Sequence, residues 1–177
     1  MAHGIIQLDA ISAQLDVALN RNAKAAYALD NGNVFQLLTK SATAGEGEVW
    51  NATAVAAIAG LTHLWMAAEP VQVVTASAFK NIDVDPRNFE IAAGKVFSAF
   101  KPQIGDIITL SADALGGTKA SNGFVVATAA EKALQWGAAA ISGLSLKLLG
   151  DSYISVADGS IGKQRVVAYQ FEVVAIA

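Results

Sequence analysis

The stretch Arg165-Val166-Val167-Ala168-Tyr169-Gln170-Phe171-Glu172-Val173-Val174-Ala175-Ile176 decides the fold class of this chain. It is long, rich in β-branched and aromatic residues, and free of glycine and proline. Its larger apolar side chains alternate with polar ones, so that one face carries Val167, Tyr169, Phe171 and Val173 and the other carries Gln170 and Glu172. A period of two predicts a strand of an antiparallel sheet with one buried face.

Working back from this run, similar short apolar segments are separated by turn residues. Residues 96–100 alternate in the same way, with Val96, Ser98 and Phe100 on one face and Phe97 and Ala99 on the other. Further strands are expected at 49–53, 61–68, 71–75, 107–111, 123–127, 144–149 and 153–156. About nine short strands with few convincing helices predict a mainly β fold, a small antiparallel β-barrel or sandwich with short helical excursions.

A second local signal lies at Asp30-Asn31-Gly32-Asn33, between the apolar runs 25–29 and 34–38. Asn-Gly tolerates the positive φ angles of a tight hairpin turn, so the two runs are expected to form a β-hairpin. The residues before it are ambiguous, because Ile5, Leu8, Ile11, Leu15 and Leu19 fit a helical stripe while the glycine and β-branched content allows an extended arm. We therefore divide the chain into an N-terminal arm (1–24) and a single β-rich domain (25–177).

Composition favours a binding protein over a catalyst. Hydrophobic residues make up 54% of the 177 residues and charged residues 15%, against about 25% charged in a typical domain. So few charges leave part of the surface apolar, and such surface usually meets a partner. The net charge is −3 without a basic run, which argues against direct nucleic-acid binding, and no segment has the length of a membrane span. The start of the chain lacks the features of a signal peptide, so we expect a soluble protein made in the cytoplasm.

Few residues could carry chemistry. Cysteine is absent, which excludes thiolate catalysis and zinc–thiolate sites. His63 lies between Leu61 and Trp65 in an apolar run, with no second ligand near it in sequence, and is read as a packed or interface histidine. Asp83 and Asp85 lack the glycine and glutamate of a calcium loop and are read as solvated loop charges. No nucleotide-binding or nucleophile motif occurs, so we expect no catalytic residues, no metal and no cofactor, and not an enzyme.

Read in order, several segments resemble the head decoration (capsid cement) proteins of tailed bacteriophages. The resemblance covers roughly residues 25–117, and the segments that carry it are 30–34, 47–52, 64–70, 88–90, 93–100 and 105–115. The chain departs from the pattern in its alanine content and in the segment 128–143. The resemblance implies a β-rich structural protein of the virion that docks on the major capsid protein lattice at the capsid surface and stabilises the shell.

For such a protein we expect the N-terminal arm and one end of the barrel to make the contact. Tryptophan is favoured at interfaces, although a core role is the favoured reading for each of Trp50 and Trp136. The expected interface residues are Ile5, Ile6, Leu8, Ile11, Leu15, Trp50 and Trp136. Self-association as a homo-oligomer is also open. The alternatives are another virion component, such as a tail tube or head–tail connector protein, and a β-barrel that binds carbohydrate or a small ligand through Trp50 or Trp136.

Overall fold

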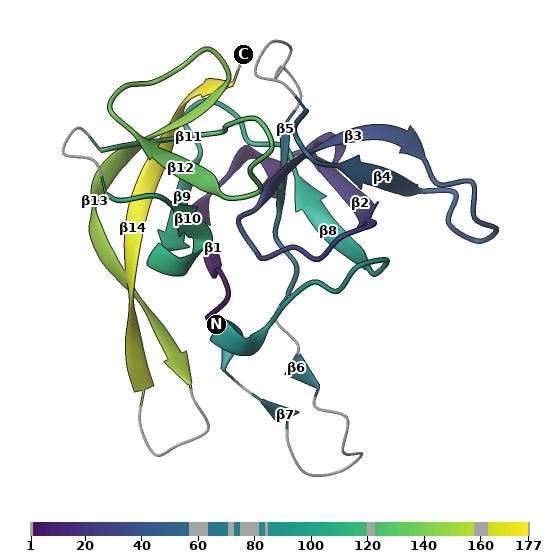
Figure 1. Cartoon of the computed structure of the whole chain (residues 1–177), viewed down its shortest axis with the longest axis horizontal. Helices are drawn as coiled ribbons and strands as arrows, with labels where there is room; N and C mark the ends of the chain where they lie inside the picture. The colour runs from purple at the N-terminus through teal and green to yellow at the C-terminus, as the bar shows by residue number, and fades with distance from the viewer. Residues whose placement is uncertain are drawn as a thin grey trace.

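The computed structural model describes residues 2–56, 64–70, 73–74, 82–83, 85–119, 123–157 and 163–176. Two sheets face one another (Figure 1). The larger one, here called the large sheet, has the strand order β1-β9-β14-β13-β11-β12-β10, and all neighbours in it are antiparallel except β12 and β10. Its strands are β1 (Ile6–Ala10), β9 (Ile107–Ser111), β14 (Lys163–Ile176), β13 (Leu144–Ala157), β11 (Phe124–Val126), β12 (Leu134–Gly137) and β10 (Leu115–Gly116).

The second sheet closes on itself in the order β2-β4-β3-β5-β8 and is here called the ring. Its strands are β2 (Asn20–Ala25), β4 (Val49–Thr53), β3 (Val34–Lys40), β5 (Leu64–Ala67) and β8 (Val96–Phe100), with only β2 and β4 parallel. A separate ladder pairs β6 (Val73–Val74) with β7 (Ile82–Asp83). The helical elements of the described part are four 3₁₀ turns, η1 (Ser12–Gln14), η2 (Val17–Leu19), η3 (Pro86–Asn88) and η4 (Ala112–Ala114).

Two cores hold the fold together. The first lies between the sheets, where Met66 and Phe100 from the ring meet Phe171 of β14 among other buried apolar side chains. The second fills the ring, where Phe35 and Phe97 pack edge to face with their centroids 5.4 Å apart. The expected mainly β fold with short helical excursions is confirmed, and the shared core makes a sandwich the better description.

The strand that opened the sequence argument is β14, which lies inside the large sheet between β9 and β13, but its faces differ from the expectation. Phe171 and Val173 are fully buried, as the alternation predicted, whereas Val167 is 48% exposed. Ala168, from the other face, is fully buried and packs with Ile5. The strand therefore changes its buried face along its length, because the first core covers only its C-terminal half and the N-terminal segment covers the opposite face of the rest.

The segment expected as an N-terminal arm is built into both sheets. Ile6 pairs with Leu110 of β9, so β1 forms an edge of the large sheet. After the turns η1 and η2, β2 joins the ring between β4 and β8. Backbone pairing thus fixes β1 and β2, and only the connection between them, residues 11–19, lies outside the sheets.

The turn at Asn31-Gly32 is present, but the expected hairpin is not. Gly32 has a φ of 88°, and the Asn33 N–H donates to the Asp30 carbonyl (3.1 Å). However, β3 pairs with β4 and β5, and β4 separates it from β2. The Asn31 amide explains this, because it donates to the Glu69 carbonyl (3.0 Å) and accepts from the Glu69 N–H (2.8 Å). These bonds tie the turn to the chain after β5 and hold it away from β2.

Candidate functional site

A surface cleft of about 680 Å³ opens at one end of the ring, where β2 and β4 begin and β3 and β8 end. We call it the ring-end cleft. Its volume lies within the range of roughly 300–1,000 Å³ that is usual for ligand sites. Its walls combine one large aromatic ring with amide, hydroxyl and charged groups, and they consist of Val17, Asn20, Arg21, Asn22, Lys40, Glu48, Trp50, Ser98 and Ala99.

Trp50 is the aromatic centre of this cleft. It is half-buried and lies opposite Lys40 on the neighbouring strand. The Lys40 ammonium lies 5.9 Å from the centre of the indole ring and 3.3 Å from the Glu48 carboxylate. An exposed ion pair of this kind adds little to stability, so it leaves Lys40 and Glu48 free to exchange partners on binding. The cleft can thus offer an indole ring together with polar groups of both signs.

The loop that joins β1 to β2 borders the cleft and exposes two large apolar side chains. We call residues 11–19 the bridging loop. Leu15 is 94% exposed and Val17, which also lines the cleft, is 84% exposed. Asp16 lies between them and caps η2 by accepting a hydrogen bond from the Ala18 N–H (2.8 Å). Val17 begins this capped turn, and Leu15 ends η1 with its N–H bonded to the Ser12 carbonyl, so both exposed side chains belong to defined local structure.

A buried carboxylate anchors this loop. Asp106, only 2% exposed, precedes β9 and accepts from the Ser12 N–H (2.8 Å) and the Ser12 hydroxyl (2.7 Å). Its other oxygen accepts from the Gln103 N–H (2.8 Å). Asp106 therefore fastens the start of the bridging loop to the β8–β9 connection and positions the exposed apolar pair.

The structure separates the seven expected interface residues into two groups. Leu15 and Trp50 lie at the ring end and are accessible. The other five pack in or against the cores: Ile5 and Ile11 are buried, and Ile6, Leu8 and Trp136 are partly buried. For Ile5 and Ile11 the expectation was wrong, because their side chains fill the protein interior. For Trp136 the core role holds, since its ring packs on Tyr169 (5.3 Å between centroids) and Phe171 (5.7 Å).

Val17 is an exposed apolar residue beside the cleft that the sequence did not single out. The helical stripe through Ile11, Leu15 and Leu19 passes over position 17, and η2 is too short to show a period of its own. The one local signal is Asp16, a residue type favoured at turn starts. An acidic residue between two isolated apolar ones is thus the only hint that the pair would face outward.

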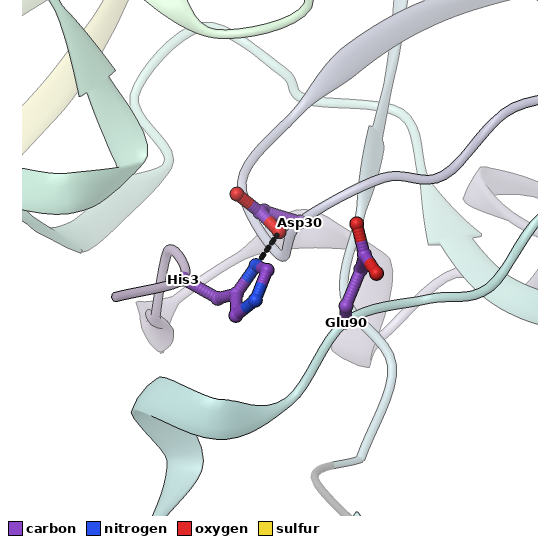
Figure 2. A group of neighbouring side chains, drawn as sticks. All are labelled: His3, Asp30 and Glu90. Atoms are coloured by element: carbon purple, nitrogen blue, oxygen red, sulfur yellow. Dashed lines mark hydrogen bonds and ion pairs between the residues drawn. The ribbon is translucent and has the colours of Figure 1, made fainter. Parts of the chain in front are cut away.

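A second group of polar side chains lies at the turn that contains Asp30, just before β3 begins. Figure 2 shows His3, Asp30 and Glu90 pointing toward one another from three separate segments. The His3 Nδ1 lies 2.7 Å from Asp30 Oδ1, and ligand atoms of all three residues lie within 4.8 Å of one another. They border a hollow of about 340 Å³ that Lys132 also lines. Imidazole and carboxylate are ligands that zinc accepts, so within the described residues this is the group that could hold a metal ion.

The remaining candidate acids are engaged or lie outside the described residues. Asp85 is buried, and its two oxygens share the Arg87 Nε–H (both 2.9 Å) while Oδ2 also accepts from Arg87 Nη2 (2.5 Å). This pairing lowers the pKa of Asp85 from its ordinary value. It is therefore an ion-paired structural carboxylate, and the reading of Asp85 as a solvated loop charge was wrong. The side chain of Asp83 and all of His63 lie outside what the structure describes.

Comparison with protein-family models, curated proteins and solved structures gave no match. No helix in the described part of the chain has the length and hydrophobicity needed to cross a membrane.

Proposed function

We propose that this chain is a structural virion protein that binds the outside of an assembled phage capsid and stabilises the shell, with the major capsid protein lattice as its partner. The choice of the capsid lattice as partner rests on the sequence resemblance. One structural observation supports the ring end, with the bridging loop, as the face that binds it. Leu15 and Val17 are exposed by 94% and 84% on an anchored loop beside Trp50. Two apolar side chains held in water by defined structure favour a surface that is covered in the assembly.

The energetics fit a repeated weak contact. Burying a Leu or Val side chain that was exposed contributes about 1.5–3 kcal/mol, so Leu15 and Val17 together supply a modest share of a single contact. A protein that binds the assembled shell but not free subunits stabilises the shell by that difference in affinity. Many copies on one lattice add such contributions, so the ring end can be small and still stabilise the particle.

The test compares binding to undecorated shells for the wild type and for Leu15→Asp/Val17→Asp. The wild type should raise the melting temperature of the shells. The double variant should bind at least about a hundredfold more weakly, since the two side chains together lose about 3 kcal/mol or more of apolar burial. Leu149→Asp is the matched control, because Leu149 is also exposed (48%) but lies on β13 of the large sheet. Absence of any shift at saturating wild-type protein, or an equal loss in the Leu149 variant, would refute the proposal.

A further inference from the structure

The edges of the large sheet differ in how they are protected. Free strand edges invite pairing with other chains, and proteins usually blunt them with charge, proline, a bulge or short length. The edge strand β1 carries exposed Asp9 and an irregular register between Leu8 and Ala10. The opposite edge strand, β10, has only two residues. The ring closes on itself and has no edge.

A third edge exists inside the sheet, because β13 is much longer than its neighbour β11. The pairing with β11 covers Ser145–Lys147 of β13, while β13 and β14 continue together as a two-stranded ribbon that extends past the rest of the sheet (Figure 1). Among the described residues, the stretch 152–156 has a backbone ladder with β14 alone. We call its other side the β13 edge.

The β13 edge has none of the usual protection. Its sequence is Ser152-Tyr153-Ile154-Ser155-Val156, without charge, proline or glycine and with three residues of high strand propensity. The facing stretch of β14 includes the exposed Arg165 and so carries charge at its own edge. An uncharged, regular strand edge of this length is a template for adding another strand.

The edge is also held rigidly. Ile154 and Val156 are buried on one face of the ribbon, where they pack with Ile5 and Ala168. The other face exposes Tyr153 (60%) and, directly across from it on β14, Val167 (48%). Because packing fixes the ribbon before any partner arrives, pairing there costs little additional ordering.

We propose that the β13 edge pairs with the same edge of a second copy of this chain, giving an antiparallel, two-fold symmetric dimer with one continuous sheet. A two-fold contact uses the same patch on both copies, and an antiparallel strand pair centred on one residue satisfies that condition. With the axis at Ile154, Ser152 of each copy lies across from Val156 of the other.

The side chains favour this register and this occupant. Tyr153 lies across from Ser155 of the second copy, and a large side chain beside a small one packs without crowding. Ser155 pairs with Arg165 on β14, so the long Arg165 side chain of the other copy can reach across the small Ser155 to the Tyr153 ring, a cation–π arrangement. The same row then reads Val167, Tyr153, Ser155 and Arg165 across four strands, and no two like charges face each other.

Sedimentation equilibrium of the purified full chain over a range of concentrations tests the proposal without any capsid, so its outcome is independent of shell binding. The wild type should show twice the monomer mass at high concentration. Tyr153→Lys should weaken the dimer about tenfold or more. The two-fold axis creates the contact twice, and each time the new lysine lies within reach of the like-charged Arg165 of the other copy. A wild type that remains monomeric at every concentration overturns the proposal.

The register is tested by rescue. In Tyr153→Lys/Ser155→Glu, each lysine faces a glutamate of the other copy, so the dimer should regain most of the lost affinity. Val167→Lys is the control, since Val167 lies one strand away from the edge and should leave the dimer intact. Failure of the rescue, or an equal loss in the Val167 variant, overturns the proposed pairing. Circular dichroism and the melting temperature of each variant confirm that the chain is folded.

Discussion

Replacing the buried Asp106 by asparagine should destabilise the whole protein, because the amide cannot reproduce the carboxylate's bonds. In the wild type one oxygen accepts two hydrogen bonds from Ser12 and the other accepts one from the Gln103 N–H. An asparagine that keeps its oxygen toward Ser12 turns its NH₂ group toward the Gln103 N–H, so a bond is lost and two donors oppose each other. A hydrogen bond to a charged group is worth about 1.5–3 kcal/mol, and we expect Asp106→Asn to cost about that much.

The loss converts to a measurable shift in melting temperature. For a chain of this size, 1 kcal/mol corresponds to about 2–4 °C, so Asp106→Asn should melt about 3–12 °C below the wild type. Urea unfolding followed by tryptophan fluorescence gives the free energy directly. Asp106→Ala, which leaves all three donors without their acceptor, should cost more than the asparagine variant.

Asp9→Asn is the matched control for this experiment. Asp9 is exposed on an edge strand, where it accepts from the Thr109 hydroxyl (2.6 Å) and the Gln170 amide (3.1 Å). Both bonds go to the same oxygen, which an asparagine amide can still provide, so the variant should stay within about 0.5 kcal/mol of the wild type. If Asp106→Asn were as harmless as Asp9→Asn, the bridging loop would not depend on its anchor, and the reasoning that links Asp106 to the presentation of Leu15 would fail.

Two further predictions concern the ion-paired Asp85 and the closely packed Gly4. The pKa of Asp85 is lowered chiefly by its hydrogen bonds with Arg87, so its ionised form stabilises the fold above the ordinary value of 3.8, and this contribution is lost as the pH falls through the lowered pKa. Asp85→Asn should therefore be less stable than the wild type at pH 7, with the gap closing in acid; urea unfolding at several pH values measures it, and a gap that is constant with pH contradicts the assignment. Gly4→Ala should cost about 1–3 kcal/mol, because a Cβ there would lie 2.8 Å from the Asn31 carbonyl oxygen and 2.9 Å from Ala114 Cα. Gly150→Ala has no atom within 4 Å of the added Cβ and is the control; equal unfolding free energies for the two variants would contradict this reasoning.

The sequence predicted strands such as β8, β9 and β14 because alternation reports burial directly, but it did not predict β1 or β12 and expected two strands where β13 continues as one. At β8 the expected faces separate as predicted, with Phe97 and Ala99 inside the ring and Val96 and Ser98 outside. Phe100 is the exception, since it is buried from the other face. That face points to the large sheet, so the end of the strand is covered on both sides. Alternation within one strand cannot show that a second sheet will cover it.

Pairing between strands was the weaker part of the prediction. The Asn31-Gly32 turn was identified correctly, but a turn fixes only the local chain direction. The choice between pairing β3 with β2 and inserting β4 depends on Asn31, whose amide bonds to the backbone of Glu69, 38 residues further along. A contact so distant in sequence leaves no local pattern, which is why the hairpin was expected and a ring formed.

The exposed residues of the bridging loop were not predicted as a pair, because its apolar residues have a helical spacing although the loop forms no α-helix. In an α-helix, Ile11, Leu15 and Leu19 would share one face and would be buried together. The connection between β1 and β2 instead leads from the large sheet to the ring through two separate 3₁₀ turns of three residues each. Breaking the stripe in this way buries Ile11 and leaves Leu15 in water. The exposed apolar pair is thus a consequence of joining two sheets by a short loop, and the buried Asp106 keeps that loop in the one conformation that presents Leu15 and Val17 outward.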